Sequence, residues 1–233
     1  MTILITGASR GIGKAIAAKF ASQGYDLLLS SRSEVALYKA MEEMQTRFPE
    51  VSVAAKAFDL SVPGEAQKLG AWVLGTNKIP DVVINNAGIF KPGSVHNEED
   101  GFLEAQLQVN LLSAYHLTRA ILPAMMERKS GHIFNMSSIA GVKAYANGGA
   151  YSISKYALNG FSSNLRQEMK PFGIKVTTVM PGAVHTESWA DFDNRDNRIM
   201  QANDVAELVY SASQLSLAAC VEEIIVRPQL GDL

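Results

Sequence analysis

The stretch Thr6-Gly-Ala-Ser-Arg-Gly-Ile-Gly13 continues directly from Thr2–Thr6, an apolar segment with the composition of a buried β-strand. Gly7, Gly11 and Gly13 permit a sharp turn from this strand into a helix, and their missing Cβ atoms leave room for a ligand close to the backbone. The unpaired N–H groups at the start of such a helix attract anions. This arrangement predicts that the diphosphate of a dinucleotide binds after the first strand.

Short apolar segments alternate with longer amphipathic segments along the whole chain. Several short segments are rich in Ile, Val and Leu on both faces, which is typical of strands covered by helices on two sides. We therefore expect one α/β domain over residues 1–233, with a Rossmann-type doubly wound sheet of about seven parallel strands and helices on both faces. The expected strands are Thr2–Thr6, Asp26–Ser30, Val51–Phe58, Val82–Asn85, His132–Met136, Lys175–Met180 and Glu223–Arg227. The expected helices are Gly13–Gln23, Glu34–Phe48, Gly64–Leu74, Asp100–Arg128, Tyr151–Lys170 and Asp204–Leu215.

The composition argues against several classes of protein. A net charge of -2 gives no reason to expect nucleic acid or an anionic membrane surface as a partner. The sequence begins with strand-like residues rather than a targeting segment, and no apolar run approaches the ~18 residues that span a bilayer. The histidines show no metal-ligand spacing, so no metal is expected, and His132 is expected only to begin a strand. The single cysteine, Cys220, has apolar neighbours that suggest an inert side chain, and a cytoplasmic location fits best.

Two polar segments interrupt the alternation. Thr186–Arg198 is rich in Asp, Asn and Arg and also contains Trp189 and Phe192. We expect it to form most of a substrate flap spanning residues 184–200, although a plain surface loop is an equally good interpretation. The other segment, Glu98-Glu-Asp100, is expected at the N-terminus of a helix, where acidic side chains interact favourably with the helix dipole.

The end of the second expected strand indicates which dinucleotide is bound. A carboxylate at this point would bind both ribose hydroxyls of NAD and repel a 2′-phosphate. Ser31 stands there instead, Arg32 follows it, and Arg10 lies within the glycine turn. Two guanidinium groups beside the adenosine ribose favour NADP(H) over NAD(H), although both could be solvated surface charges. Asp59 closes the third strand, where it could accept a hydrogen bond from the adenine amine or cap the next helix.

Three polar residues in the second half of the chain could act on a carbonyl group. Tyr151 and Lys155 are spaced i, i+4, which places them on one face of a helix. A nearby ammonium group stabilises phenolate and lowers the pKa of tyrosine from about 10 toward neutrality. Ser138 follows the fifth strand and can donate a hydrogen bond to a substrate oxygen. Each of these signals recurs by chance on its own, and only their combination is informative.

Together these motifs resemble the short-chain dehydrogenase/reductase family, in its compact single-domain branch. The matching elements span nearly the whole chain, in the order and at the spacing of that family. They are Thr6-Gly-Ala-Ser-Arg-Gly-Ile-Gly13, Asn85-Asn-Ala-Gly88, Asn110 in Gln108-Val-Asn-Leu111, Asn135-Met-Ser-Ser138, Tyr151-Ser-Ile-Ser-Lys155 and Pro181-Gly-Ala-Val-His-Thr186. Two departures are slight. Ser31 replaces the acid of NAD-dependent relatives, and the chain is somewhat short, so that a small flap is expected.

The resemblance implies a role for each matching residue. Tyr151 would be the general acid/base, Lys155 would lower its pKa and bind the nicotinamide ribose, and Ser138 would orient the carbonyl. Asn110 would hold a water molecule that links Lys155 to solvent, although a solvent-facing Asn is the alternative. Thr186 would bond the carboxamide of the nicotinamide. The expected cofactor-binding residues are Gly7, Ser9, Arg10, Gly11, Ile12, Gly13, Ser31, Arg32, Asp59, Leu60, Asn86, Ala87, Gly88, Tyr151, Lys155, Pro181, Gly182, Val184 and Thr186.

Our first functional hypothesis is an NADP(H)-dependent oxidoreductase that transfers a hydride between the nicotinamide and a carbonyl or secondary alcohol. Its substrate cavity would be lined by Ile89–Gly93, Val142–Asn147 and the Val184–Arg198 part of the flap. Phe90, Tyr145 and Trp189 suggest a partly apolar small molecule. One alternative is a regulatory protein that senses NADP(H) without turnover, although such a protein would need none of the catalytic residues. Another is a sugar-nucleotide epimerase or dehydratase, but those relatives usually have a larger C-terminal substrate domain.

The resemblance also suggests a homotetramer or homodimer. Apolar positions in Leu111–Met126 and Leu158–Leu165 could line an interface of paired helices, and core packing explains many of them equally well.

Overall fold

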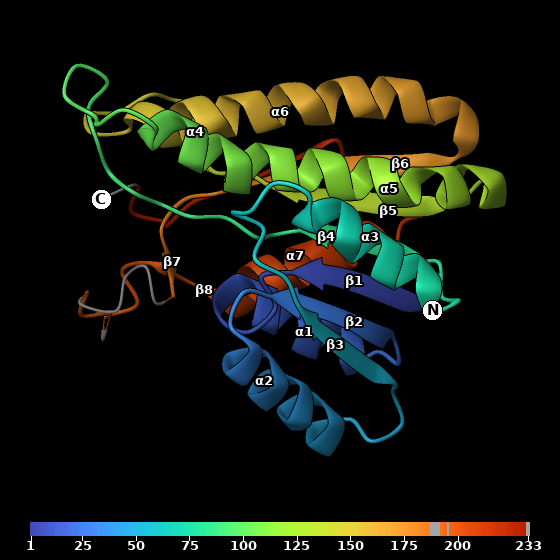
Figure 1. The fold of residues 1–233 in the computed structure, drawn as a ribbon. Coiled ribbons are helices and arrows are strands. Elements are labelled where there is room, and N and C mark those ends of the chain that lie inside the picture. Colours follow the sequence, from blue (N-terminus) through green and yellow to red (C-terminus); the bar gives the residue numbers. More distant parts are fainter. Residues whose placement is uncertain (187–191, 195, 232–233) are drawn as a thin grey trace.

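A computed structural model describes residues 1–186, 192–194 and 196–231 of the chain. At its centre lies a sheet of seven strands in the order β3-β2-β1-β4-β5-β6-β9, with all neighbours parallel (Figure 1). The predicted Rossmann-type sheet is therefore confirmed. The bounds of two strands agree with the prediction, and those of the other five differ by one or two residues at one or both ends. The strands are β1 (Thr2–Thr6), β2 (Asp26–Ser31), β3 (Val53–Ala57), β4 (Val82–Asn85), β5 (Gly131–Met136), β6 (Ile174–Pro181) and β9 (Glu223–Val226).

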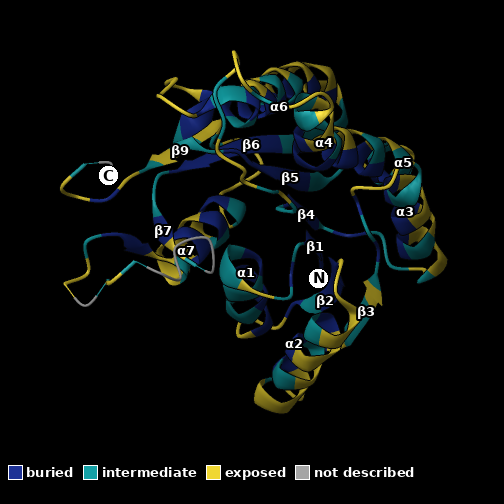
Figure 2. Cartoon of the chain, turned by 60° about the vertical axis from the view of Figure 1, so that its left-hand side comes forward, coloured by how far each residue is buried: buried dark blue, intermediate teal, exposed yellow. Residues whose placement is uncertain are grey.

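Helices cover both faces of this sheet, and Figure 2 shows its buried central strands between the two helical layers. One layer contains α1 (Gly11–Ala21), α2 (Glu34–Arg47) and α7 (Ala202–Ser213). The other contains α3 (Glu65–Gly75), α5 (Ser113–Arg128) and α6 (Gly149–Met169). Each layer encloses an apolar core of its own, and burial of these side chains is the main force that holds the layers to the sheet. Because the strands are parallel, their carboxyl ends meet at one edge, where α/β proteins bind ligands.

The predicted helix Asp100–Arg128 is wrong in one respect, because the structure divides it into three segments. α4 (Phe102–Leu107) leads into a π-helical turn at Gln108–Leu112, after which α5 begins. The first segment begins later than predicted because Gly101 has a left-handed φ of 82°. π-helical turns widen a helix locally and are frequent at functional sites. The turn here contains Asn110, whose side chain contacts residues of two other segments.

The segment predicted as a flap, residues 184–200, is fixed at its two ends by a small second sheet. β7 (Val184–His185) pairs in parallel with β8 (Met200–Gln201). Trp189, with the rest of 187–191, lies outside the described residues, so the flap stays a prediction. Within the described part of the chain, no helix has both the length and the apolar character needed to cross a membrane.

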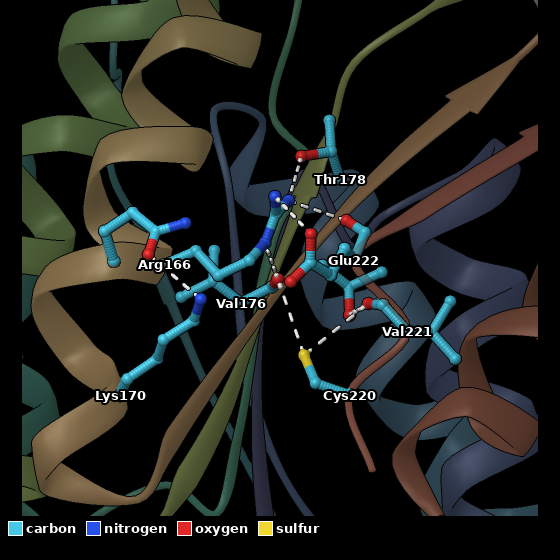
Figure 3. Close-up of polar contacts among 9 residues, drawn as sticks. Arg166, Lys170, Val176, Thr178, Cys220, Val221 and Glu222 are labelled. Atoms are coloured by element: carbon cyan, nitrogen blue, oxygen red, sulfur yellow. Dashed lines mark hydrogen bonds and ion pairs between the residues drawn. The ribbon is translucent and has the colours of Figure 1, made fainter.

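Arg166 of α6 joins that helix to the last two strands of the sheet (Figure 3). Its Nε donates to the carbonyl oxygen of Val176 at 2.9 Å, and its Nη2 donates to the carbonyl oxygen of Glu222 at 2.7 Å. Nη1 lies 3.4 Å from the Glu222 carboxylate. These partners explain how a guanidinium group can be buried here. Cys220 lies nearby and is exposed, whereas the sequence suggested an apolar environment.

His132 lies inside the sheet as a neutral imidazole. Its Nε2 is 2.7 Å from Oγ1 of Thr177, and that hydroxyl donates its own hydrogen to the carbonyl oxygen of Val221. Nε2 therefore carries the imidazole hydrogen. Nδ1 is buried without a hydrogen-bond partner among the described residues. Burial, together with the positive charge of Lys175, lowers the pKa of His132 to about 3.

We expect the free energy of unfolding to fall as the pH is lowered below about 6.5, because the unfolded chain then takes up a proton at His132 that the folded chain does not bind until about pH 3. The contribution of neutral His132 to the free energy of unfolding is complete above pH 6.5 and is lost as the pH falls toward 3. The free energy of unfolding falls by up to about 1.4 kcal/mol per pH unit in this range. Urea titrations between neutral and mildly acidic pH measure this slope. His132→Gln keeps a donor for Thr177 but does not titrate, so an equal slope in that variant would contradict the assignment.

Candidate active site

Two adjoining cavities lie at the carboxyl ends of the strands. The smaller, of about 550 Å³, contains Ser138, Tyr151 and Lys155. The larger, of about 910 Å³, lies along the glycine turn after β1 and the end of β2. Ile12 and Thr186 line both cavities, so the two meet at these residues. The predicted chemical residues and the predicted cofactor residues are thus neighbours in space.

The glycine turn after β1 is held against the end of β4. Oγ1 of Thr6 accepts hydrogen bonds from the backbone nitrogens of Asn86 (3.0 Å) and Ala87 (2.9 Å). Nδ2 of Asn86 donates to the carbonyl oxygen of Gly7 at 3.2 Å. Gly7 has a φ of 65°, and a Cβ atom added to it would lie 2.8 Å from that Nδ2. A glycine is required here by both the backbone conformation and the close contact.

The first turn of α1 faces the larger cavity. Arg10 stands at the N-cap without a side-chain hydrogen bond to the helix, and the first turn contains no acidic residue. The N–H groups and dipole of this first turn can therefore attract an anion into the cavity. Gly11 comes so close to Thr186 that an added Cβ would lie 3.3 Å from its Cγ2. The absence of a side chain at position 11 keeps the backbone of the turn accessible from the cavity, which fits a diphosphate bound against that backbone.

Arg32 and Asp59 lie on the wall of the larger cavity. The Ser61 hydroxyl donates to Oδ1 of Asp59 at 2.6 Å, and the Ser61 backbone nitrogen donates to the same oxygen at 3.0 Å. These bonds, with a smaller contribution from the positive charge of Arg32, lower the pKa of Asp59. The expected helix cap is wrong, because the N-cap of α3 is Gly64 and Asp59 instead closes its own turn. Contact between Asp59 and adenine stays a prediction.

Ser138 and Tyr151 meet in the smaller cavity. Ser138 follows β5, Tyr151 lies in the first turn of α6, and both line this cavity. The ring of Phe90 packs edge-on against Tyr151 with 4.9 Å between ring centroids. Burial raises the pKa of Tyr151, and the nearby Ser138 side chain offsets part of this rise. The result differs from the expectation of a lowered pKa, because in the chain alone burial outweighs the favourable contacts.

Lys155 is almost completely buried behind Tyr151. Its Nζ donates to the carbonyl oxygen of Met136 at 2.9 Å and lies 5.7 Å from the centre of the Tyr151 ring. Burial lowers the pKa of Lys155 to about 8, so the amine is mostly charged at neutral pH. An ammonium group at this separation stabilises a phenolate more than a phenol.

Asn110 connects the loop after β4 to α6. Its Oδ1 accepts from the backbone nitrogen of Ile89 at 2.8 Å. Its Nδ2 donates to the carbonyl oxygen of Ile89 at 3.0 Å and to Oγ of Ser154 at 2.9 Å. The side chain is buried, so the solvent-facing alternative is wrong. Its role in holding a water molecule stays a prediction. Ser154 gave no signal in the sequence, because a serine within a helix has no distinctive spacing.

The structure brings most of the predicted site residues to the two cavities. Gly13 and Asn110 are the exceptions, since both lie behind the cavity walls. Apolar wall residues of the smaller cavity that were not predicted as site residues include Met136, Ile139 and Ala140. The smaller cavity is lined by the predicted residues Ile12, Asn86, Gly88, Ser138, Tyr151, Lys155, Pro181, Gly182, Val184 and Thr186. The larger is lined by Gly7, Ser9, Arg10, Gly11, Ile12, Ser31, Arg32, Asp59, Leu60, Asn86, Ala87, Gly88 and Thr186.

Comparisons with known proteins show the family to which the chain belongs. A family model described as short chain dehydrogenase matches residues 1–197. Sepiapterin reductase of Chlorobaculum tepidum is 30% identical over 239 residues, which cover 99% of this chain and 97% of that protein. A metagenomic short-chain oxidoreductase, solved in complex with NADP, is similar with a TM-score of 0.85 and 32% identity, covering 98% of this chain and 97% of its own. An alcohol dehydrogenase from the archaeon Thermococcus sibiricus, complexed with 5-hydroxy-NADP, has a TM-score of 0.90 and 27% identity, with coverage of 98% and 96%. The chain therefore belongs to the short-chain dehydrogenase/reductase family of NAD(P)-dependent oxidoreductases.

Proposed function

We propose that the protein is an NADP(H)-dependent reductase of ketones or aldehydes, with Tyr151 as its general acid/base. The observation that carries this proposal is that Ser138, Tyr151 and Lys155 line one cavity, with the Lys155 amine 5.7 Å from the centre of the Tyr151 ring. The second cavity, which adjoins the first, presents an uncapped helix N-terminus to an anion. The solved complexes of two relatives with NADP or 5-hydroxy-NADP support the choice of cofactor. When bound, NADP(H) would supply the hydride that reduces the carbonyl carbon.

In this proposal the chain provides two donors to one oxygen atom. Ser138 and Tyr151 would both donate hydrogen bonds to the carbonyl oxygen, whose negative charge grows during reduction. Tyr151 would then give its proton to that oxygen, and Lys155 would stabilise the phenolate left behind. The raised pKa of Tyr151 keeps the phenol protonated, which suits its role as an acid in the direction of reduction.

The wall of the smaller cavity supports a partly apolar substrate. Phe90 and Ile139 line it together with Tyr145, and its volume of about 550 Å³ is within the range for small-molecule sites.

The proposed function is tested by measuring NADPH oxidation. The expected result is that the purified protein oxidises NADPH in the presence of at least one member of a panel of ketones and aldehydes. Tight binding of NADPH with no turnover across the panel would favour the alternative of a cofactor-sensing protein.

Replacing Arg32 by Ala is expected to raise the KM for NADPH by about tenfold or more, and to leave the KM for NADH nearly unchanged. A hydrogen bond to a charged group contributes about 1.5–3 kcal/mol, and only NADPH has the 2′-phosphate that Arg32 would bind. Steady-state kinetics with both cofactors measure the change. Lys39→Ala is the matched control. Lys39, on the neighbouring helix α2, is exposed like Arg32 but does not line the cavity. An unchanged NADPH/NADH preference in Arg32→Ala would show the cofactor assignment to be wrong.

For the assembly we propose a homodimer or homotetramer that uses α5 and α6. Tyr115 of α5 and Tyr156 of α6 are both substantially exposed, and Tyr115 packs edge-on against Phe161 of α6 at 5.5 Å. Exposed aromatic side chains on two adjacent helices support a helix-paired interface.

A further inference from the structure

The helix that carries Tyr151 has no side-chain cap of its own. α6 begins at Gly149, and Gly148 at the N-cap position has no side chain that could accept a hydrogen bond. Ala150, the residue before Tyr151, has an exposed fraction of 0%. Because a buried N–H group without a partner is destabilising, the first turn of α6 requires an acceptor from elsewhere in the chain.

Glu98 supplies this acceptor from 52 residues away in the sequence, since its Oε1 accepts from the backbone nitrogen of Ala150 at 2.9 Å. The carboxylate reaches the helix between two glycines. A Cβ atom on Gly149 would collide with Oε1, and one on Gly93 would lie 2.8 Å from it. The negative charge also interacts favourably with the dipole of α6. Glu98 therefore lies at a helix N-terminus, as the sequence predicts. The helix is α6 and not α4, although α4 is the next helix after Glu98 in the sequence.

Two more hydrogen bonds join the same parts of the chain. The backbone nitrogen of Gly93 donates to the carbonyl oxygen of Asn147 at 3.0 Å, and Oγ of Ser94 donates to Oδ1 of Asn147 at 2.7 Å. Asn147 has a left-handed φ of 60°, which asparagine tolerates better than most residues. We call these two bonds and the bond between Glu98 and Ala150 the loop seam. Figure 1 shows the loop after β4, in green, reaching the end of the molecule at which α6 begins.

Both segments that the loop seam joins also line the smaller cavity. Ile89 and Phe90 lie just before the seam residues on one segment, Ala144 and Tyr145 lie just before Asn147 on the other, and all four line the cavity. The edge-on contact of Phe90 with Tyr151 joins the first of these segments to the phenol ring itself. Bonds that hold the two segments together therefore fix both the width of the cavity and the start of the helix that carries the phenol.

We propose that Glu98 is a positioning residue for the reaction. Through the loop seam it sets the place of the Tyr151 phenol and limits the size of the carbonyl substrate that the cavity admits. The proposal deepens the proposed function and rests on it for its kinetic readout.

The test compares Glu98→Ala, Glu98→Gln and Glu99→Ala, using kcat and KM for a small ketone and for a bulkier homologue. In Glu98→Ala we expect kcat for the small ketone to fall by about 10- to 100-fold, because a small displacement of a reacting group has an effect of this size. The ratio of kcat/KM for the bulky ketone to that for the small one should rise. The KM for NADPH should not change, because no seam residue lines the larger cavity.

The two other variants separate the hydrogen bond from general effects of mutation. Gln at position 98 keeps an oxygen acceptor for the backbone nitrogen of Ala150, so Glu98→Gln should restore most of the activity. Glu99 is exposed and lines neither cavity, so Glu99→Ala should behave like the wild type. A folded Glu98→Ala protein with wild-type kcat, KM and size preference would overturn the proposal, as would equal losses in the Ala and Gln variants.

Hydrogen exchange at the Ala150 amide gives a readout that does not require turnover. Exchange should be faster in Glu98→Ala than in the wild type and in Glu98→Gln, and equal rates in all three would overturn the proposal even if the wild type reduced no carbonyl in the panel. If Glu98→Ala does not fold, Asn147→Gly serves in its place. This substitution keeps the left-handed backbone but removes the bond to Ser94, and the same rise in preference for the bulky ketone is expected.

Discussion

Replacing Tyr151 by Phe is expected to lower kcat for ketone reduction by about 10²- to 10⁴-fold, which is the usual contribution of a positioned general acid. The variant keeps the ring and its edge-on packing against Phe90, so the shape of the cavity is preserved. It loses only the hydroxyl that, in our proposal, gives its proton to the substrate. Single-turnover oxidation of bound NADPH measures the chemical step directly, without a contribution from product release.

Tyr115→Phe is the matched control for this experiment. It removes a phenolic hydroxyl from α5, and Tyr115 lines neither cavity. Wild-type turnover in the control, together with NADPH binding by Tyr151→Phe in a fluorescence titration, would locate the loss in the chemical step. Near wild-type turnover by Tyr151→Phe would rule out the phenol as the acid.

Replacing Lys155 by Met is expected to slow the oxidation of a secondary alcohol by up to about 10³-fold at neutral pH. Oxidation requires the phenolate of Tyr151, and a charged neighbour lowers the pKa of such a group by about 1–3 units. Without the ammonium, the rate should rise with pH only at higher values than in the wild type. The pH dependence of kcat/KM for NADP⁺-dependent oxidation measures this displacement.

Lys155→Arg should lie between the wild type and Lys155→Met, because it keeps the charge but not the shape of the side chain. Both substitutions disturb the bond from Nζ to the carbonyl oxygen of Met136, so circular dichroism is needed to confirm that each variant is folded. A pH profile for Lys155→Met that coincides with the wild-type profile would mean that the amine does not control the phenol.

The sheet could be predicted from the sequence because its signals are local. Thr2–Thr6 and Val82–Asn85 are short apolar segments bounded by turn residues, and both strands have the predicted bounds. The position of the glycine turn could be predicted equally well, because the positive φ of Gly7 and its closeness to Asn86 require a residue without a Cβ. For these elements the residue type and its neighbours in sequence carry enough information.

The features that the sequence did not reveal depend on distant partners. The π-helical turn at Gln108–Leu112 accompanies bonds from Asn110 to Ile89 and Ser154, which are 21 and 44 residues away. The cap that Glu98 places on α6 spans 52 residues. The pKa of Tyr151 depends on how deeply the folded chain buries the ring, and the i, i+4 spacing to Lys155 does not reveal this. None of these contacts produces a periodic pattern in the amino-acid sequence.

The attachment of α6 to the last strand also affects when contacts of this helix can form during synthesis of the protein. Arg166 binds the backbone of Glu222, which the ribosome adds 56 residues later. While the nascent chain ends before this point, the guanidinium lacks its most distant acceptor and β6 has no neighbour on its outer side. The bond from Arg166 to Glu222 can therefore form only after translation has passed residue 222, whereas the bond to Val176 can form earlier.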